Sequence, residues 1–101
     1  DLVRATRRYM KDHMRESIRL DDLAAAAQLS KYHFLRRYRA LTGRTPAQDM
    51  RIVRVEAARD IIRHGDMPLK AVAAAVGFVN EYHFSRIFKQ HFGVPPGYFR
   101  K

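Results

Sequence analysis

Two stretches of the chain repeat a tyrosine, an arginine and a second cation at the same spacing. The two sets are Tyr32, Arg36 and Arg39, and Tyr82, Arg86 and Lys89. On a helix, at about 100° per residue, each set falls on one side, opposite large apolar residues. An arginine on an outward helix face can donate two hydrogen bonds to O6 and N7 of guanine. The pattern therefore favours contact with the bases of DNA.

Each of these residues also has a plain structural interpretation. Arg36 and Arg86 could be ordinary solvated charges on helix surfaces. Tyr32 and Tyr82 could pack against the protein, or they could contact a base or sugar. Leu35, at the flank of the first set, could meet a thymine methyl group or be a simple exposed leucine. The repetition of face, spacing and chemistry favours DNA contact for the two arginines.

The opposite sides of the same two segments carry residues that should anchor them in a core. These are Phe34, Tyr38 and Leu41 in the first, and Phe84, Ile87 and Phe88 in the second. Each segment follows a short alanine-rich stretch and a turn, which is the layout of a helix-turn-helix. The matched positions are Tyr32-His33-Phe34 with Tyr82-His83-Phe84, Arg36 with Arg86, Tyr38 with Phe88, Arg39 with Lys89, Gly43 with Gly93, and Pro46 with Pro96. The second turn contains one extra residue, placed at Val79.

Helical patterning dominates the rest of the chain, and the sequence predicts an all-α fold of about seven helices. The expected helices cover residues 2–16, 23–28, 31–42, 46–64, 68–76 and 81–92, with a last short piece after Pro95-Pro96. Ser30 and Asn80 are the expected N-caps of the two longer basic helices, and Gly43 and Gly93 their ends.

We expect one domain, residues 1–101, made of two helix-turn-helix subdomains joined by a long linking helix. The expected parts are a first unit at 1–45, the linking helix at 46–64 and a second unit at 65–101. A helix of roughly 19 residues is about 28 Å long, so it could set two outward helices in adjacent major grooves, about 34 Å apart. Its expected core stripe is Met50, Val53, Ala57 or Ala58, Ile61 and Ile62.

The charge balance points to a polyanionic partner. The 101 residues include 20 Lys and Arg against 10 Asp and Glu, a net charge of +10. The partner could be DNA, RNA or an anionic membrane surface. Acids are absent from 31–44 and after Glu81, so the positive charge gathers near the two outward faces, as a phosphate footprint requires. No stretch approaches the roughly 18 apolar residues of a membrane span, and the lack of cysteine excludes disulfides and thiolate sites.

The sequence offers no enzymatic constellation. It has no Gly-x-Ser-x-Gly elbow, no glycine-rich phosphate loop and no His-Glu-x-x-His. His33 and His83 occupy matching flanks without an acid at ligand spacing, so we expect them to pack or touch phosphate. We expect no enzyme activity, no metal and no cofactor. The alternative function is non-specific binding of RNA or anionic membranes by a basic helical protein, whose aromatics would be exposed rather than placed at anchor positions.

Three segments of the second unit carry a family resemblance. They are Ala-Ala-Ala-Val-Gly-Phe at 73–78, Tyr-His-Phe-Ser-Arg-Ile-Phe-Lys at 82–89 and Gly-Val-Pro-Pro-Gly-Tyr-Phe-Arg at 93–100. Together they resemble the signature of the AraC/XylS family. Residues 30–38 are similar to that family's first recognition helix, and 54–58 with Ile61-Ile62 are similar to its linking helix. The resemblance covers essentially the whole chain.

The resemblance implies an all-helical domain that binds double-stranded DNA and regulates bacterial transcription, usually as an activator that contacts RNA polymerase. It implies a cytoplasmic protein, located on the nucleoid through DNA, with no membrane partner. In most members a separate N-terminal effector-binding or dimerisation domain precedes this one, and a chain that starts at Asp1 without Met fits such an excised domain.

The resemblance also implies a set of contacts. The implied base contacts are Tyr32, Leu35, Arg36, Glu81, Tyr82, Ser85 and Arg86. The expected phosphate contacts are Lys31, His33, Arg39, Asn80, His83 and Lys89.

Two positions depart from the pattern. Gln28 stands where the second unit has Gly77, and at a positive φ a non-glycine costs about 1–2 kcal/mol. Asp49 occupies a position where the family usually has an aromatic residue. We expect the first unit to be the less rigid one.

Overall fold

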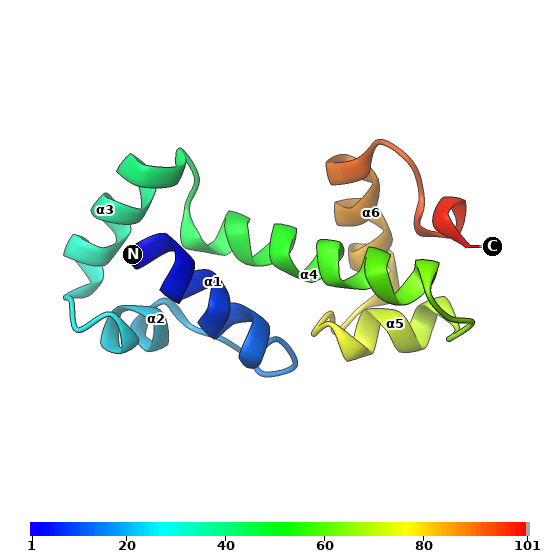
Figure 1. Cartoon of the computed structure of the whole chain (residues 1–101), viewed down its shortest axis with the longest axis horizontal. Coiled ribbons are helices and arrows are strands. Elements are labelled where there is room, and N and C mark those ends of the chain that lie inside the picture. The colour runs from blue at the N-terminus through cyan, green and yellow to red at the C-terminus, as the bar shows by residue number, and fades with distance from the viewer. Residues whose placement is uncertain (101) are drawn as a thin grey trace. The chain divides into compact units, whose positions relative to one another are not determined.

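A computed structural model describes residues 1–100, and within them the helices are joined by turns and loops, with no strand (Figure 1). The helices are α1 (Leu2–Asp12), α2 (Leu20–Ala26), α3 (Lys31–Thr42), α4 (Pro46–Arg63), α5 (Leu69–Ala75), α6 (Glu81–Phe92) and the 3-10 helix η1 (Pro96–Phe99). The all-α prediction of about seven helices is confirmed. None of the described helices is both long and apolar enough to cross a membrane.

The two longer basic helices begin and end where local capping chemistry predicts. The Ser30 hydroxyl oxygen accepts a backbone N–H three residues on at 3.1 Å and starts α3. The Asn80 side-chain oxygen accepts two backbone N–H groups at 2.7 and 3.1 Å and starts α6. Gly43 and Gly93 end the helices with φ of 75° and 78°, which glycine adopts without steric strain.

Two predicted boundaries in the first half of the chain are wrong. α1 ends at Asp12 rather than near Glu16, because the next residue leaves the helical region and the chain turns. α2 begins at Leu20 rather than Leu23, since the Asp22 carboxylate accepts the backbone N–H of Arg19 at 2.9 Å. The acidic residue thus caps α2 from within its first turn rather than preceding it.

The chain divides into two compact units, Asp1–Val53 and Arg54–Lys101, so each unit includes part of α4. In the first unit α1, α2 and α3 pack on one another, and in the second α5 packs on α6, which also contacts η1. Each unit therefore has a short helix, a turn and a longer helix in succession (Figure 1).

The core of the first unit is formed by residues from all of its helices. Its buried members are Met10, Leu23, Ala24, Phe34, Tyr38, Met50 and Val53. The anchors Phe34 and Tyr38 are fully buried, as predicted. The same prediction is wrong for Leu41, which is 58% exposed because it lies in the last turn of α3, past the level of the core.

The second unit relies on phenylalanines. Phe84 and Phe88 are fully buried, with ring centroids 5.7 Å apart, while Ile87 is only half-buried. Phe88 continues the cluster to Phe92 at 4.6 Å and Phe99 at 5.9 Å. Aromatic pairs in this distance range add stabilisation beyond the area that they bury. The phenylalanine cluster thus holds the inner side of α6.

The core stripe of α4 is largely as predicted, with two additions. Of the residues expected there, Met50, Val53, Ala58 and Ile62 are buried, and Ala57 and Ile61 are half-buried. Asp49 and Val55 are also fully buried, and the sequence pattern did not identify either of them.

The turns before α3 and α6 share one unusual backbone conformation. Gln28 has a φ of 59° and Gly77 a φ of 97°. The predicted condition for strain at Gln28 is therefore met, because a side chain at positive φ approaches the following carbonyl oxygen.

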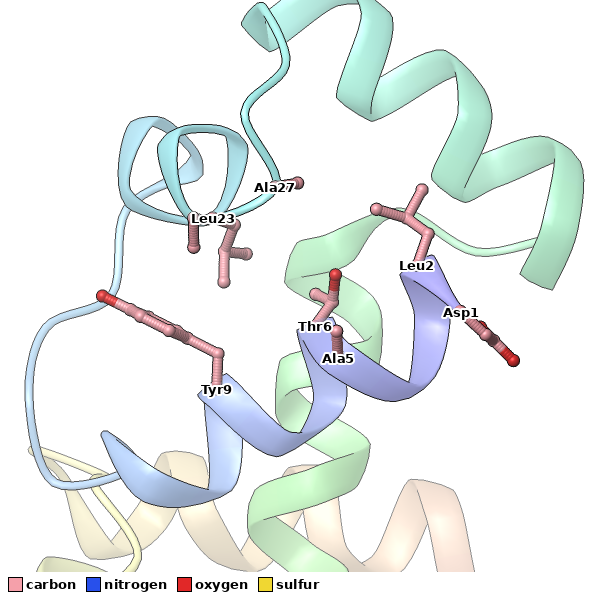
Figure 2. A pocket seen from close by; sticks show the side chains of 8 residues that line it. Asp1, Leu2, Ala5, Thr6, Tyr9, Leu23 and Ala27 are labelled. Atoms are coloured by element: carbon pink, nitrogen blue, oxygen red, sulfur yellow. The ribbon is translucent and has the colours of Figure 1, made fainter.

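A groove of about 260 Å³ lies between α1 and α2 (Figure 2). Its lining residues are Asp1, Leu2, Ala5, Thr6, Tyr9, Leu23, Ala26 and Ala27. The Asp1 carboxylate accepts the backbone N–H groups of Val3 and Arg4 as the cap of α1. None of the predicted contact residues lines this groove.

Candidate nucleic-acid interface

The side of α3 opposite its buried anchors is open to solvent. Tyr32 is 82% exposed, and Arg36 and Arg39 are exposed with it. Because Phe34 and Tyr38 are buried on the other side, a large rotation of α3 would expose two aromatic rings. The helix therefore keeps one tyrosine and two arginines on its solvent side.

The corresponding side of α6 has the same organisation. Tyr82 is 87% exposed, and Arg86 and Lys89 are exposed, while Phe84 and Phe88 are buried. Both helices are N-capped, so their first turns are ordered. As in any α-helix, the backbone N–H groups point toward the N-terminal end, where Tyr32 and Tyr82 lie. The repeat seen in the sequence is thus a repeat of two outward surfaces.

The remaining predicted contact residues lie on or beside these surfaces. Leu35, Ser85 and His83 are half-buried at the flanks. The exposed ones are Lys31, His33, Asn80 and Glu81. His83 packs its ring edge against Phe78 at 5.6 Å, which fits the packing interpretation of this histidine.

Two cations of the stretch 31–44, the predicted phosphate contact Lys31 and also Arg44, have acidic partners. The Lys31 ammonium lies 3.3 Å from the Asp21 carboxylate, with both side chains more than half exposed. The Arg44 guanidinium donates to Asp49 from Nε at 3.2 Å and from Nη2 at 2.9 Å. The stretch 31–44 is acid-free in sequence, but the fold brings carboxylates from α2 and α4 to its two ends.

The sequence marked Asp49 as a departure from the family pattern but did not reveal that its side chain is buried and partnered. Its carboxylate accepts the hydroxyl of Tyr38 and lies 3.7 Å from the Arg7 Nε, in addition to the Arg44 contacts. Burial, reinforced by the hydrogen bond to Asp49, raises the pKa of Tyr38 well above its ordinary value of 10. The alignment of Pro46 with Pro96 could have indicated this burial, since it matches Asp49 with Phe99 of the second unit.

Comparison with known proteins identifies the family. Residues 23–101 match the family model described as a helix-turn-helix domain. The chain is 39% identical over 93 residues to the MmsAB operon regulatory protein of Pseudomonas aeruginosa, and the aligned segment covers 92% of this chain and 30% of that protein. It is 31% identical over 88 residues to the transcriptional activator RhaS of Escherichia fergusonii, covering 87% of this chain and 32% of that protein. The chain thus spans about a third of the length of these relatives.

Solved structures of other proteins have the same fold over nearly the whole chain. An AraC-type regulator from Chromobacterium violaceum has a TM-score of 0.92 at 22% identity, covering 98% of this chain and 88% of that one. The DNA-binding domain of AdpA, solved in complex with a target DNA, has a TM-score of 0.87 at 29% identity, covering 99% of this chain and 90% of that one. The family match, the bacterial relatives and the doubled helix-turn-helix agree, and the chain belongs to the AraC/XylS family as an AraC-type helix-turn-helix domain.

Proposed function

We propose that this chain is the part of a transcription regulator that binds double-stranded DNA sequence-specifically, with α3 and α6 as its recognition helices. The observation that carries the proposal is the repeated outward surface, a tyrosine and an arginine exposed opposite two buried aromatics. The net charge of +10 favours a polyanionic partner. The AdpA domain, 29% identical, is solved on its target DNA.

The residues on and beside the two outward surfaces suggest specific roles. Arg36 and Arg86 suit bidentate donation to guanine in the major groove, and Leu35 suits a thymine methyl group. Tyr32 and Tyr82 suit base or sugar contacts near the start of each helix. The phosphate contacts proposed are Lys31, His33, Arg39, Asn80, His83 and Lys89. Phosphate contacts of this kind would set register, and the arginines would set sequence.

The two surfaces differ at the reading positions, so we expect two unlike half-sites. Leu35 in α3 corresponds to Ser85 in α6, and Lys31 corresponds to Glu81. A carboxylate can accept a hydrogen bond from cytosine N4, whereas an ammonium group can only donate. One chain would therefore bind an asymmetric site rather than a palindrome.

We also propose that the two units, 1–45 and 65–101, bind the same DNA duplex at the same time and that the linking segment 46–64 joins them. Two recognition helices on one face of the duplex need half-sites separated by about 10 base pairs. Inserting about five base pairs, half a turn, should lower the affinity toward that of a single unit. Unchanged affinity would show that only one helix reads DNA.

The whole protein is larger than this domain in the relatives, and its further properties are part of the proposal. RhaS is named an activator and is about three times the length of the matched segment, which supports an activating role and a separate N-terminal effector or dimerisation domain. We propose RNA polymerase as the partner of the DNA-bound protein, in the bacterial cytoplasm on the nucleoid, and no enzymatic activity.

The test is selection of bound sequences from random duplex DNA, followed by arginine variants. Arg36→Ala and Arg86→Ala should each cost about 1–3 kcal/mol and relax preference at one base-pair position. Arg8→Ala, an equal change of charge at an exposed site on α1, is the matched control and should leave the preference intact. Equal losses on selected and scrambled DNA would reassign the arginines to phosphate. Equal binding of random duplex, RNA and anionic vesicles would instead favour the non-specific alternative.

A further inference from the structure

The first recognition helix is held at a buried carboxylate that belongs to α4. Asp49 is fully buried and accepts the hydroxyl of Tyr38, which comes from the inner side of α3. Arg44, in the turn between the two helices, donates to the other carboxylate oxygen at 2.9 and 3.2 Å. Arg7 of α1 lies 3.7 Å away. Three separate elements of the first unit thus meet at one side chain.

The second unit fills the same place with apolar residues. The two units align without a gap from Tyr32 and Tyr82 to Pro46 and Pro96 and beyond. In this alignment the matched residues are Tyr38 with Phe88, Arg44 with Val94, and Asp49 with Phe99. Phe88 and Phe99 contact each other, with ring centroids 5.9 Å apart. The ring–ring contact of the second unit therefore corresponds to a hydroxyl–carboxylate contact in the first. Val94 of the second unit corresponds to Arg44, whose positive charge balances the carboxylate.

The exchange has a physical consequence for α3. Apolar packing is non-directional, so it resists separation more than it resists a small rotation or slide. A hydrogen bond to a charged group is short and directional, and a buried carboxylate is strongly unfavourable without its partners. Displacing α3 would remove the Tyr38 hydroxyl from Asp49, and the network therefore selects one orientation of the helix.

We propose that Asp49 is a positioning residue for sequence reading by the first unit, acting through Tyr38, with Arg44 as its counter-charge. The proposal rests on the DNA-binding function proposed above. Asp49 itself is fully buried and does not contact DNA. It sets the orientation in which α3 presents Tyr32 and Arg36, and so affects the half-site read by α3 and not the one read by α6.

The test uses the 101-residue chain and duplexes selected by it from random DNA. Half-sites are first assigned to α3 and α6 with Arg36→Ala and Arg86→Ala. Tyr38→Phe, which removes one hydroxyl, should lower the affinity ratio of correct to scrambled first half-site by about tenfold. Asp49→Asn should lower it at least as much, and both variants should keep the parent's ratio at the second half-site.

A double-mutant cycle separates positioning from general packing. Because Tyr38 is proposed to act through Asp49, adding Tyr38→Phe to Asp49→Asn should change the first half-site ratio by less than about twofold. Asp60→Asn, the same chemical change at an exposed site of α4, should leave both ratios unaltered. Unchanged helical content by circular dichroism shows that the first unit, which carries the Tyr38 and Asp49 substitutions, is folded, and retained binding of the second half-site shows that the second unit is folded.

The outcomes are distinct. If folded Tyr38→Phe and Asp49→Asn leave the first half-site ratio unchanged, or lower both ratios equally, Asp49 contributes only to stability and the proposal is wrong. Additive losses in the cycle would also overturn it, since Tyr38 would then act independently of Asp49. A parent chain with no preference for any selected sequence would instead refute the DNA-reading function itself.

Discussion

Replacing Gln28 by glycine should stabilise the first unit. Gln28 has a φ of 59°, and an L-residue in this left-handed region is less stable by about 1–2 kcal/mol than in a right-handed one. Glycine has no such penalty but loses more backbone entropy on folding, about 0.5–1 kcal/mol. The side chain of Gln28 is exposed, so its removal forfeits little packing. The difference leaves a net gain of about 0.5–1 kcal/mol.

The reciprocal change in the second unit should be larger and of opposite sign. Gly77 has a φ of 97°, farther from the left-handed minimum near 57° that an L-residue tolerates best. Gly77→Gln should therefore destabilise the second unit by more than Gln28→Gly stabilises the first. The comparison uses the same two residue types at equivalent turns, so differences in side-chain chemistry largely cancel.

Urea denaturation measures both effects. With an m-value of about 1.5 kcal/mol/M, a gain of about 0.5–1 kcal/mol raises the midpoint by roughly 0.3–0.7 M. Amide hydrogen exchange assigns the change to one unit, because local opening is reported residue by residue. Gln28→Ala keeps a Cβ atom and should give no comparable gain. If Gln28→Ala stabilises the chain as much as Gln28→Gly, or if neither does, backbone strain at this turn is not the cause.

Three further predictions concern charge. Asp21→Asn removes the acidic partner of Lys31, 3.3 Å away, and should raise DNA affinity by up to about fivefold, as expected for an exposed ion pair. The affinity should also depend more steeply on salt, and an unchanged salt slope would contradict a phosphate contact by Lys31. Arg39→Ala or Lys89→Ala should lower the slope of log affinity against log salt by about one, measured by fluorescence anisotropy at several salt concentrations. Because the pKa of Tyr38 is raised in the folded state by burial and by its carboxylate partner, its contribution to stability is complete below about pH 10 and declines as the pH rises further. Unfolding measured between neutral and strongly alkaline pH should show a smaller decline for Tyr38→Phe, and an identical decline would argue against this assignment.

Local chemistry accounts for what could be predicted from the sequence. The bounds of α3 and α6 follow from a polar N-cap and a glycine at positive φ, which act within one helical turn. Their inner and outer sides follow from the helical period. Large apolar residues spaced three or four positions apart lie on one side of a helix, and that side packs into the core. The repeat of these features indicated two equivalent units and the family, before any contact between distant residues was known.

The tertiary structure decided the features that depend on residues far apart in the chain. In the sequence Asp49 stands out only as an acid where the family usually has an aromatic residue, and it becomes a buried partner of Tyr38 and Arg7 only when α1, α3 and α4 pack together. Leu41 has the helical phase of a core residue but lies past the level of the core, so it is exposed. Periodicity gives the angle of a side chain around its own helix; how far the neighbouring helices extend along that side, and which partner a charge meets there, are set by packing.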